Sequence, residues 1–293
     1  GIDVKGDVFL QDGLIAYGEV NLAGAKIGGQ LSCVGGRFSN CDNDGNSKGL
    51  AINAQTIDVK GGVFLKNGFT ADGEVSLSGA QIGGQLSCIR GRIRNCDKDG
   101  NAIGMAINAQ GIDVKGSVFL RDGFTAEAEV SLSGAQIGGQ LSCEGSTFRN
   151  CDSDGNAQGM AINAQDIDVK GSVHLRGGFI AEGEVSFIGA QIGGQVSCNG
   201  GTFRNCDKDG NAKGDALNAQ GIDVKGSVFL ADSFTAEGQV RLSGAIIGGQ
   251  LSCNGSTFRN CDSDGNAISL ALNAQGIDVK GDVFLQDGLI AYG

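Results

Sequence analysis

Apolar residues recur along the chain in short pairs, with one residue, polar in most of the pairs, between the two members of each pair. Examples from two successive stretches are Val20/Leu22, Ala25/Ile27 and Leu31/Cys33, then Ile52/Ala54, Ile57/Val59, Val63/Leu65 and Phe69/Ala71. This alternation is typical of β-strands that bury one face, and no segment shows the 3.6-residue period of an amphipathic helix. We therefore expect an all-β protein with strands of about three or four residues separated by Gly-containing corners.

The same pattern returns at a fixed interval. The string Ile-Asp-Val-Lys-Gly begins every 55 residues, at Ile2, Ile57, Ile112, Ile167, Ile222 and Ile277. Self-similarity at a fixed period comes before any local motif, because it dictates the architecture. The repeats, which we expect to form one continuous solenoid, are 1–55, 56–110, 111–165, 166–220, 221–275 and the partial repeat 276–293.

Each repeat contains a shorter pattern twice. Residues 25–33 match residues 57–65, 32 positions later, and residues 80–88 match again after a further 23. The longer interval holds about nine extra residues, 40–48, so we expect about 23 residues per coil and two coils per repeat. The predicted fold is a β-solenoid (β-helix) with about four strands per coil, right-handed by the general preference of crossover connections. At ~4.8 Å per coil, the rod is expected to be on the order of 50 Å long.

The two ends of the chain carry the same sequence. Residues 276–293 repeat residues 1–18 without a difference, and neither end offers a polar capping element. A bare terminal coil is an exposed sheet edge, so we expect further coils to extend the stack, within one chain or between chains. The chain begins with Gly1 and shows no signal peptide, which indicates a mature product or a piece of something longer.

Composition narrows the list of partners. The chain has 53 Gly, no Pro and a formal net charge of −11. An acidic chain is not expected to bind nucleic acid or an anionic membrane surface, because both require a basic face. No apolar run approaches the roughly 20 residues of a bilayer span, so we expect no membrane insertion.

One segment carries a resemblance to a known family. Residues 18–33 read GEVNLAGAKIGGQLSC. This string resembles a bacterial repeat family with GEVxLxGAxIGGQLSC repeats, often named membrane-associated oxidoreductases and similar to pentapeptide-repeat and bactofilin-type solenoids. The resemblance covers essentially the whole chain and implies the solenoid fold. The oxidoreductase activity that the name implies is not expected, because no Gly-rich dinucleotide turn opens a helix and the Gly-Gly pairs fall at coil corners.

A polar segment, Asn-Cys-Asp-x-Asp-Gly-Asn, occurs once in every full repeat. Oxygen side chains at alternate positions before a Gly resemble the start of a calcium loop. The candidate ligands are Asp42, Asp44, Asn46, Asp97, Asp99, Asn101, Asp152, Asp154, Asn156, Asp207, Asp209, Asn211, Asp262, Asp264 and Asn266. The alternative is a surface turn whose Asx side chains bond to their own backbone. No Glu follows to give bidentate ligation, and calcium is the one cofactor that the sequence suggests.

Cysteines occur twice in every full repeat, on either side of the start of this polar segment. The pairs are Cys33/Cys41, Cys88/Cys96, Cys143/Cys151, Cys198/Cys206 and Cys253/Cys261. Five disulfides would pin the loops and indicate an oxidising compartment. Alternatively, the first Cys of each pair lies in the core, because it occupies the position of Leu65 in the sister coil. Zinc or redox use is a third possibility, although two thiolates without His leave a zinc shell incomplete.

An aromatic residue lies between the inward Val and Leu of each Val-x-Leu strand. The series is Phe9, Phe64, Phe119, His174, Phe229 and Phe284. We expect these side chains to point outward, about 10 Å apart, and to form a lateral contact surface. The alternative is that a neighbouring loop covers them. His174 is expected to be a tolerated surface replacement.

A repeated convex rod with one His does not offer the unique constellation that catalysis needs, so we expect no enzyme. Ice binding requires a regular Thr array, and the Thr residues are sparse and without a grid in the linear sequence. The predicted function is a structural protein that stacks into an extracellular or cell-surface filament, with itself as partner, end to end and laterally. The alternative is a rod segment of a surface adhesin or scaffold that presents its loops to ligands.

Overall fold

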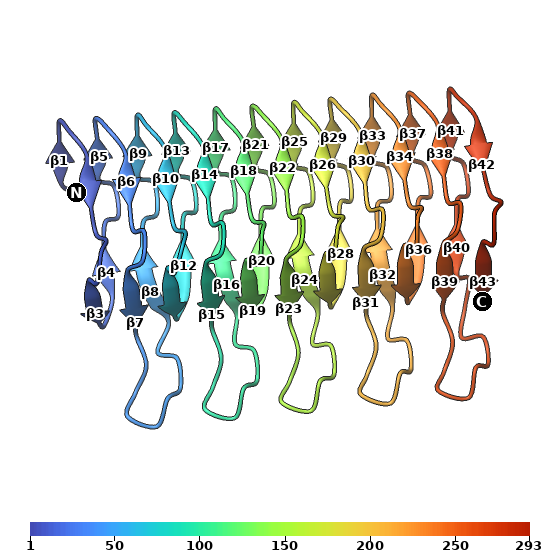
Figure 1. The fold of residues 1–293 in the computed structure, drawn as a ribbon, viewed down its shortest axis with the longest axis horizontal. Helices are drawn as coiled ribbons and strands as arrows, with labels where there is room; N and C mark the ends of the chain where they lie inside the picture. The colour runs from blue at the N-terminus through green and yellow to red at the C-terminus, as the bar shows by residue number, and fades with distance from the viewer.

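The computed structural model describes residues 1–293, and it contains β-strands and no helix. The chain winds into a rod of stacked coils, and strands of successive coils pair in parallel (Figure 1). The pairing produces four sheets, three with 11 strands and one with 10. This confirms the predicted all-β solenoid with four sides. The handedness of the winding stays a prediction.

We call the four sheets A, B, C and D, in the order in which each coil visits them. Sheet A consists of β1 (Asp3–Val4), β5 (Lys26–Ile27), β9 (Asp58–Val59), β13 (Gln81–Ile82), β17 (Asp113–Val114), β21 (Gln136–Ile137), β25 (Asp168–Val169), β29 (Gln191–Ile192), β33 (Asp223–Val224), β37 (Ile246–Ile247) and β41 (Asp278–Val279). Sheet B consists of β2 (Val8–Phe9), β6 (Leu31–Ser32), β10 (Val63–Phe64), β14 (Leu86–Ser87), β18 (Val118–Phe119), β22 (Leu141–Ser142), β26 (Val173–His174), β30 (Val196–Ser197), β34 (Val228–Phe229), β38 (Leu251–Ser252) and β42 (Val283–Phe284).

The remaining two sides flank the loops. Sheet C consists of β3 (Ile15–Tyr17), β7 (Arg37–Ser39), β11 (Thr70–Asp72), β15 (Arg92–Arg94), β19 (Thr125–Glu127), β23 (Thr147–Arg149), β27 (Ile180–Glu182), β31 (Thr202–Arg204), β35 (Thr235–Glu237), β39 (Thr257–Arg259) and β43 (Ile290–Tyr292). Sheet D consists of β4 (Val20–Asn21), β8 (Leu50–Asn53), β12 (Glu74–Ser76), β16 (Met105–Asn108), β20 (Glu129–Ser131), β24 (Met160–Asn163), β28 (Glu184–Ser186), β32 (Asp215–Asn218), β36 (Gln239–Arg241) and β40 (Leu272–Asn273).

Strand pairing fixes the lengths of the coils. Asp3 pairs with Lys26, 23 residues later, Lys26 pairs with Asp58, 32 later, and Asp58 pairs with Gln81, again 23 later. We call the two kinds short and long coils. Every long coil carries its extra residues as a loop between sheets C and D, and the loops project from one side of the rod (Figure 1). The coil length and the position of the loop agree with the prediction from the sequence.

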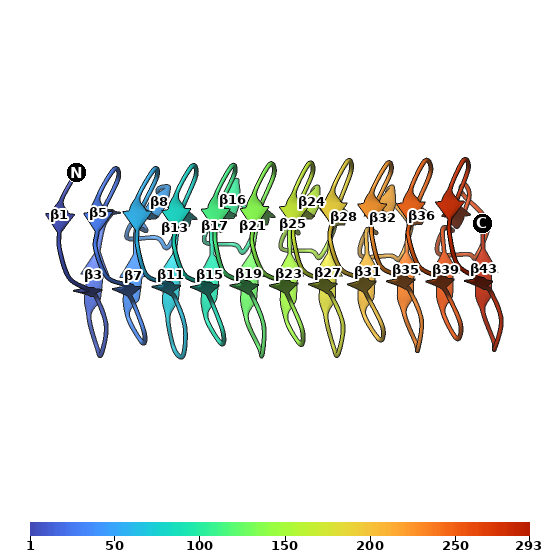
Figure 2. The same ribbon diagram turned by 90° about the horizontal axis from the view of Figure 1, so that it is seen from above.

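The interior of the rod is one cluster of 72 buried residues. The inward residues of all four sheets meet there, as the alternation of apolar and polar positions requires. A file of Phe rings runs through this core, from Phe124 to Phe258, with successive ring centroids 4.9 to 5.6 Å apart. Seen from above, the body is straight and its coils are evenly spaced (Figure 2).

Glycines at one corner of the coil bring the backbones of neighbouring coils together. One Gly from each coil donates its N–H to the carbonyl of the equivalent Gly of the preceding coil, at 2.8 to 3.0 Å. A Cβ on Gly171 would lie 2.8 Å from the Gly139 carbonyl oxygen, so a side chain there would push two coils apart. The members of this glycine ladder are Gly6, Gly29, Gly61, Gly84, Gly116, Gly139, Gly171, Gly194, Gly226, Gly249 and Gly281.

Candidate functional site

The loops are closed turns. In the third loop, the Asp152 carboxylate accepts hydrogen bonds from the backbone N–H groups of Asp154 (3.1 Å) and Asn156 (2.8 Å) and from the Asn156 amide (2.8 Å). The Gly155 N–H donates to the Asp152 carbonyl at 3.0 Å. The other four loops repeat these side-chain bonds. The Asn156 side-chain amide, followed by the backbone donors, holds the pKa of the Asp152 carboxyl below its ordinary value.

Each loop is also bonded to the next loop. The Asn156 Oδ1 atom accepts a hydrogen bond from the Lys208 N–H at 3.0 Å, and the Ala157 N–H donates to the Cys206 carbonyl at 3.1 Å. The same Asn oxygen makes the corresponding bond at the other three junctions, Asn46 to Lys98, Asn101 to Ser153 and Asn211 to Ser263. The loops therefore form one connected row along the rod.

These bonds account for the polar motif without a metal ion. Both carboxylate oxygens of Asp152 and the Oδ1 atom of Asn156 already accept hydrogen bonds. No three side chains among His, Cys, Asp and Glu come together as a metal-binding cluster. Calcium needs six to eight converging oxygens, and binding of this ion by the candidate ligands stays a prediction. The alternative interpretation, a self-bonded surface turn, fits the structure.

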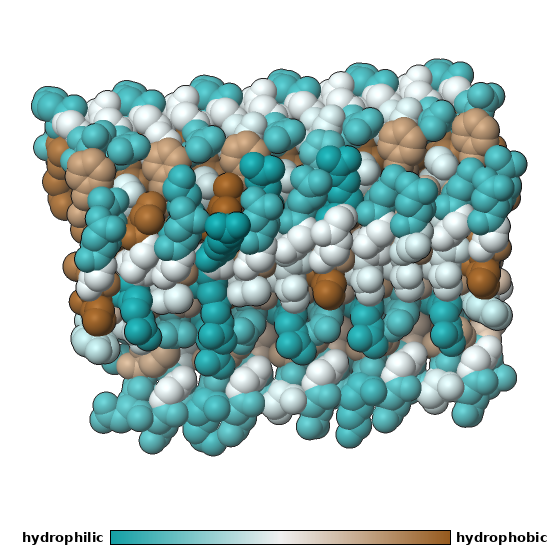
Figure 3. Space-filling view, viewed as in Figure 1, coloured by the Kyte–Doolittle hydropathy of each residue, from teal (hydrophilic) through white to brown (hydrophobic).

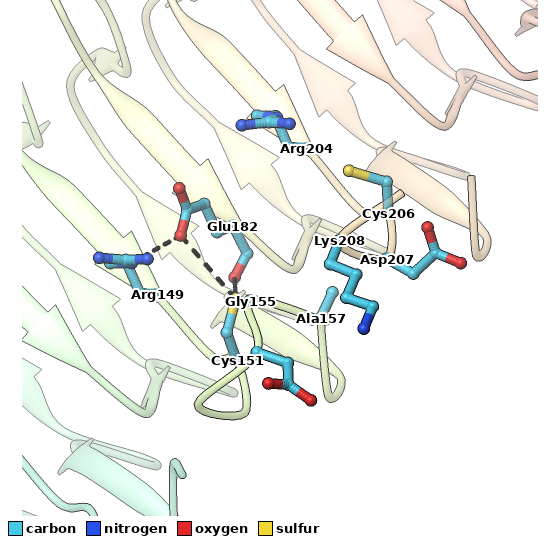
Figure 4. A pocket seen from close by; sticks show the side chains of 10 residues that line it. Arg149, Cys151, Gly155, Ala157, Glu182, Arg204, Cys206, Asp207 and Lys208 are labelled. Carbon is cyan, nitrogen blue, oxygen red and sulfur yellow. Dashed lines mark hydrogen bonds and ion pairs between the residues drawn. The ribbon is translucent and has the colours of Figure 1, made fainter. Parts of the chain in front are cut away.

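A shallow hollow lies between neighbouring loops. Between the third and fourth loops it has a volume of about 240 Å³, and Arg149, Cys151, Glu182, Arg204 and Cys206 lie around it (Figure 4). Equivalent hollows of about 210 and 200 Å³ lie one repeat before and one repeat after it. The hollows thus recur with the period of the loops.

The floor of these hollows is a file of alternating charges on the outer side of sheet C. Strand register places its members in the order Asp72, Arg94, Glu127, Arg149, Glu182, Arg204, Glu237 and Arg259. Arg149 pairs with Glu182 at 2.6 Å and Arg204 with Glu237 at 2.8 Å. This file is not among the features predicted from the sequence, although its signal is the Ala-Glu of short coils alternating with the Phe-Arg of long coils.

The disulfide prediction is wrong at all five predicted pairs, because every cysteine of the chain is a free thiol. The free thiols are Cys33, Cys41, Cys88, Cys96, Cys143, Cys151, Cys198, Cys206, Cys253 and Cys261. Nine of them are buried, and Cys41, in the first loop, is half-buried. The alternative interpretation, that the first Cys of each pair is a core residue, fits the structure.

The two cysteines of a predicted pair lie on different sides of the rod. Cys33 directly follows β6 of sheet B and faces the core, in the position that Leu65 occupies in the sister coil. Cys41 follows β7 of sheet C and lies at the root of the loop, where its thiol donates to the Asp72 carbonyl at 3.9 Å and its backbone bridges to Ser47. One thiol thus lies in the interior and the other at the loop root, which is why Cys33 and Cys41 form no disulfide. The same division applies in the other four repeats.

Loop cysteines of neighbouring repeats do not pair with one another either. Cys151 and Cys206 border the same loop hollow. They belong to successive long coils, which are two coils or about 10 Å apart. That separation exceeds the ~7 Å between Cα atoms that a disulfide can bridge.

Burial keeps Cys33, Cys88 and Cys151 as protonated thiols. It raises the pKa of Cys33 and of Cys88 to about 12. For Cys151, which lies at a loop root, burial and then the nearby Glu182 carboxylate raise the pKa to about 11. Reactive cysteines have a lowered pKa, so these thiols are not activated nucleophiles.

The predicted aromatic residues lie in one file on the outer side of sheet B. Ser87 pairs with Phe64 on one side and Phe119 on the other, so Phe of short coils and Ser of long coils alternate. Phe64 and Phe119 are half-buried, and the Ser87 between them is fully buried. Figure 3 shows the file as a row of tan rings with one gap, with no loop over it. We call Phe9, Phe64, Phe119, His174, Phe229 and Phe284 the aromatic stripe; its role as a lateral contact surface stays a prediction.

His174 is the one interruption of the stripe. Its partners in the neighbouring coils are Ser142 and Ser197. The other members of the stripe also pair with Ser residues. Burial, followed by the positive charge of Arg176, lowers the pKa of its imidazole. Its Nδ1 atom is buried without a hydrogen-bond partner. These surroundings are those expected for a residue that has replaced Phe at a surface position.

The prediction that the Thr residues form no regular array is wrong in part. Thr125 pairs with Thr147, and Thr202, Thr235 and Thr257 occupy consecutive coils of sheet C at the same position. The Thr residues therefore form a file, which a linear sequence hides because its members are 22 or 33 residues apart. The neighbouring outward file carries the alternating Arg and Glu, so the face is not a uniform hydroxyl surface.

Comparison of the chain with protein-family models, with curated proteins and with solved structures returned no match. The resemblance to the GEVxLxGAxIGGQLSC repeat family is therefore still an expectation. The structure offers no helical segment with the length and hydrophobicity that crossing a membrane requires. The repeated surfaces described above are therefore the basis for a proposed function.

Proposed function

We propose that this chain is a structural protein that builds a filament by continuous stacking of β-solenoid coils. The observation that carries the proposal is the uninterrupted pairing of the coils. Sheets A, B and C each run through 11 strands in parallel, and the glycine ladder follows without a gap from Gly6 to Gly281. Because every junction between coils repeats the same contacts, a further coil can be added by the same interactions.

Burial inside the rod supports this proposal. Val63 and Leu65 are 0% and 2% exposed, because the coils on either side cover them. Each coil that is added to the stack therefore buries apolar side chains of its neighbour and pairs with its strand edge.

The proposal is for a non-enzymatic protein outside the cell or on its surface. What favours a structural role over catalysis is repetition, since each hollow and each thiol recurs from repeat to repeat. With free thiols, the argument for an oxidising compartment from disulfides no longer applies. The proposed location therefore depends on the filament alone.

Electron microscopy of the purified chain tests the filament. We expect long fibres of uniform width, with an axial repeat of about 10 Å that corresponds to two coils. A population of discrete short rods at all concentrations would contradict end-to-end stacking.

A matched pair of variants at the edge of sheet A sharpens this test. The backbone N–H groups of Asp278 and Lys280 donate hydrogen bonds to the preceding coil, at the carbonyl groups of Ala245 and Ile247. Because alternate residues of a strand point to opposite sides, the N–H of Val279 faces away from the chain's own coils. Val279→Pro removes this one donor and is expected to shorten the fibres. Val279→Ile retains the donor and repeats Ile247, which occupies the equivalent position of the preceding coil, so this variant is expected to form fibres like the parent.

A second candidate function is a rod segment that presents its loops to ligands, as in an adhesin or scaffold. The observation that favours it is the row of equivalent hollows between the loops. Discrete rods that bind a ligand, and that lose this binding when Arg149 or Arg204 is substituted, would favour this function over the filament.

A further inference from the structure

We propose that the aromatic stripe binds an extended, uncharged β-1,4-linked glycan that runs along the rod. In this arrangement, each Phe ring of the stripe stacks against one sugar ring of one disaccharide. The proposal goes beyond the filament, because it assigns a ligand to one side of a single rod. The residues that carry it are Phe9, Phe64, Phe119, Phe229 and Phe284.

Spacing is the first argument. The register of sheet B places one aromatic residue on every second coil, with Ser32, Ser87 and Ser142 between them. Two coils correspond to about 10 Å. An extended β-1,4-linked glycan turns each sugar over relative to the next, so its chemical repeat is the disaccharide, and that repeat is close to the spacing of two coils.

The shape of the stripe is the second argument. Ser87 and Ser142 are fully buried although they are on the outer side of the sheet, so their neighbouring rings lie over them. The Phe64 ring also reaches back along its strand, because a Cβ on Gly62 would lie 2.9 Å from its Cζ atom. The rings therefore lie along the sheet and present a flat file to solvent (Figure 3). Aromatic faces of this kind stack on flat apolar surfaces, such as the C–H face of a β-linked sugar.

Area argues against a second copy of the chain as the occupant. Phe9 is 55% exposed and the other four rings are half-buried, which leaves on the order of 400 Å² of ring surface to cover. A stable protein interface buries about 800 Å² on each partner. A neutral ligand one sugar ring wide requires less area.

The residues beside the rings suit sugar hydroxyl groups. The Lys66 Nζ atom lies 4.8 Å from the centre of the Phe64 ring, and the Arg121 guanidinium lies 4.7 Å from that of Phe119. Cations held over a ring at an exposed site are held weakly. We expect both side chains to move aside and donate hydrogen bonds to the hydroxyl groups of a stacked sugar.

His174 divides the stripe into two segments. Three rings precede it, at Phe9, Phe64 and Phe119, and two follow it, at Phe229 and Phe284. Cellohexaose has three disaccharide repeats and matches the first segment. A longer glycan must pass over His174, so the chain itself provides a position where restoring Phe should strengthen binding.

The test is affinity electrophoresis of the folded chain in gels that contain hydroxyethyl cellulose, with calorimetry on cellohexaose. We expect retardation of the parent and no retardation by a soluble α-linked glucan, whose helical chain does not present a flat ribbon. The double variant Phe64→Leu/Phe119→Leu keeps apolar side chains but loses the rings, and binding should weaken about tenfold or more. His174→Phe should bind long glycans several-fold more tightly.

Ile246→Ala is the matched control, because Ile246 is an exposed apolar residue (46%) on sheet A, away from the stripe. This control should bind the glycan like the parent. For the Phe64→Leu/Phe119→Leu variant, an unchanged circular dichroism spectrum and melting temperature would show that it remains folded. Absence of retardation of the parent, or parental binding by the folded Leu variant, would overturn the proposal. Side-by-side association of rods without glycan that the Leu variant abolishes would identify a second copy as the occupant. Fibre length is read separately, so failure of the filament and failure of glycan binding are distinguishable.

Discussion

The four-sheet body and the loop row are equally regular in sequence but are held together differently. In the body, each coil pairs with the next through four sheets and through the glycine ladder, and the inward side chains form one core. In the loop row, neighbours lie two coils apart, and two or three hydrogen bonds join each loop to the next, such as those from Lys208 to Asn156, from Ala157 to Cys206 and from Lys213 to Ala157. The same repetition therefore reflects packing in the body and local hydrogen bonding in the loops. Only the packing of the body should determine the stability of the rod.

The largest effect should come from the aromatic file inside the body. Phe203 is fully buried, with ring centroids 4.9 Å from Phe179 and 5.1 Å from Phe234. Phe203→Ala removes both contacts and leaves a cavity, so the free energy of unfolding should fall by about 3–5 kcal/mol in urea titrations. Phe203→Ile is the matched control, because Ile93 already occupies the equivalent position two repeats earlier. If Ala and Ile cost the same, the rings do not contribute through packing.

The glycine ladder should be the next most sensitive feature. A Cβ on Gly171 would lie 2.8 Å from a backbone oxygen of the preceding coil, whereas the adjacent Lys170 has an exposed side chain. Gly171→Ala should lower the stability of the rod by about 1–3 kcal/mol, because two coils must separate, and Lys170→Ala, which removes only a surface ion pair, should be nearly neutral. Equal melting temperatures for the two variants would show that close approach of the coils is not required.

The core cysteines should make the body sensitive to alkali. Burial raises the pKa of Cys88 from its ordinary value of 9.0 to about 12, so the unfolded chain loses this proton first. Its contribution to stability is complete below about pH 9 and is lost progressively between pH 9 and 12. We expect the urea midpoint to fall over this window, and to fall less in Cys88→Val. A parallel decline in both proteins would assign the alkaline effect to other groups.

A short coil also contains one strained residue. Ala128 is buried and has a φ of 124°, where the corresponding residues of neighbouring repeats are Gly73 and Gly183, with φ values of 127° and 128°. Non-Gly residues in this region are strained by about 1–3 kcal/mol. Ala128→Gly should therefore raise the melting temperature, while Ala126→Gly, in the adjacent strand β19, should lower it. A loss of stability in Ala128→Gly would contradict the strain.

More of the body than of the loop row could be predicted from the sequence, for a physical reason. Inward positions such as Leu65 and Cys33 follow from local alternation, and the coil lengths follow from the spacing of the repeats. The charge file could be read only after Glu182 was aligned with Arg149, 33 residues away, so it requires the register between coils. The bond from Lys208 to Asn156 joins residues 52 apart through a side-chain oxygen. A linear motif does not reveal this bond, because the bond depends on which loops lie next to one another.

The smallest effect should come from the loops, and it separates the two interpretations of their motif. Asn156→Ala removes the amide bond to Asp152 and the acceptor of the Lys208 N–H. The body does not depend on these bonds, so global stability should change by less than about 1 kcal/mol, while amide exchange at Lys208 should accelerate. Asp154→Ala is the matched control, because its N–H bond to Asp152 survives the substitution. In a calcium loop the Asp154 carboxylate would be a ligand, so excess calcium would stabilise the parent and not this variant. In the self-bonded turn, calcium should leave the melting curve and the exchange rates of both proteins unchanged.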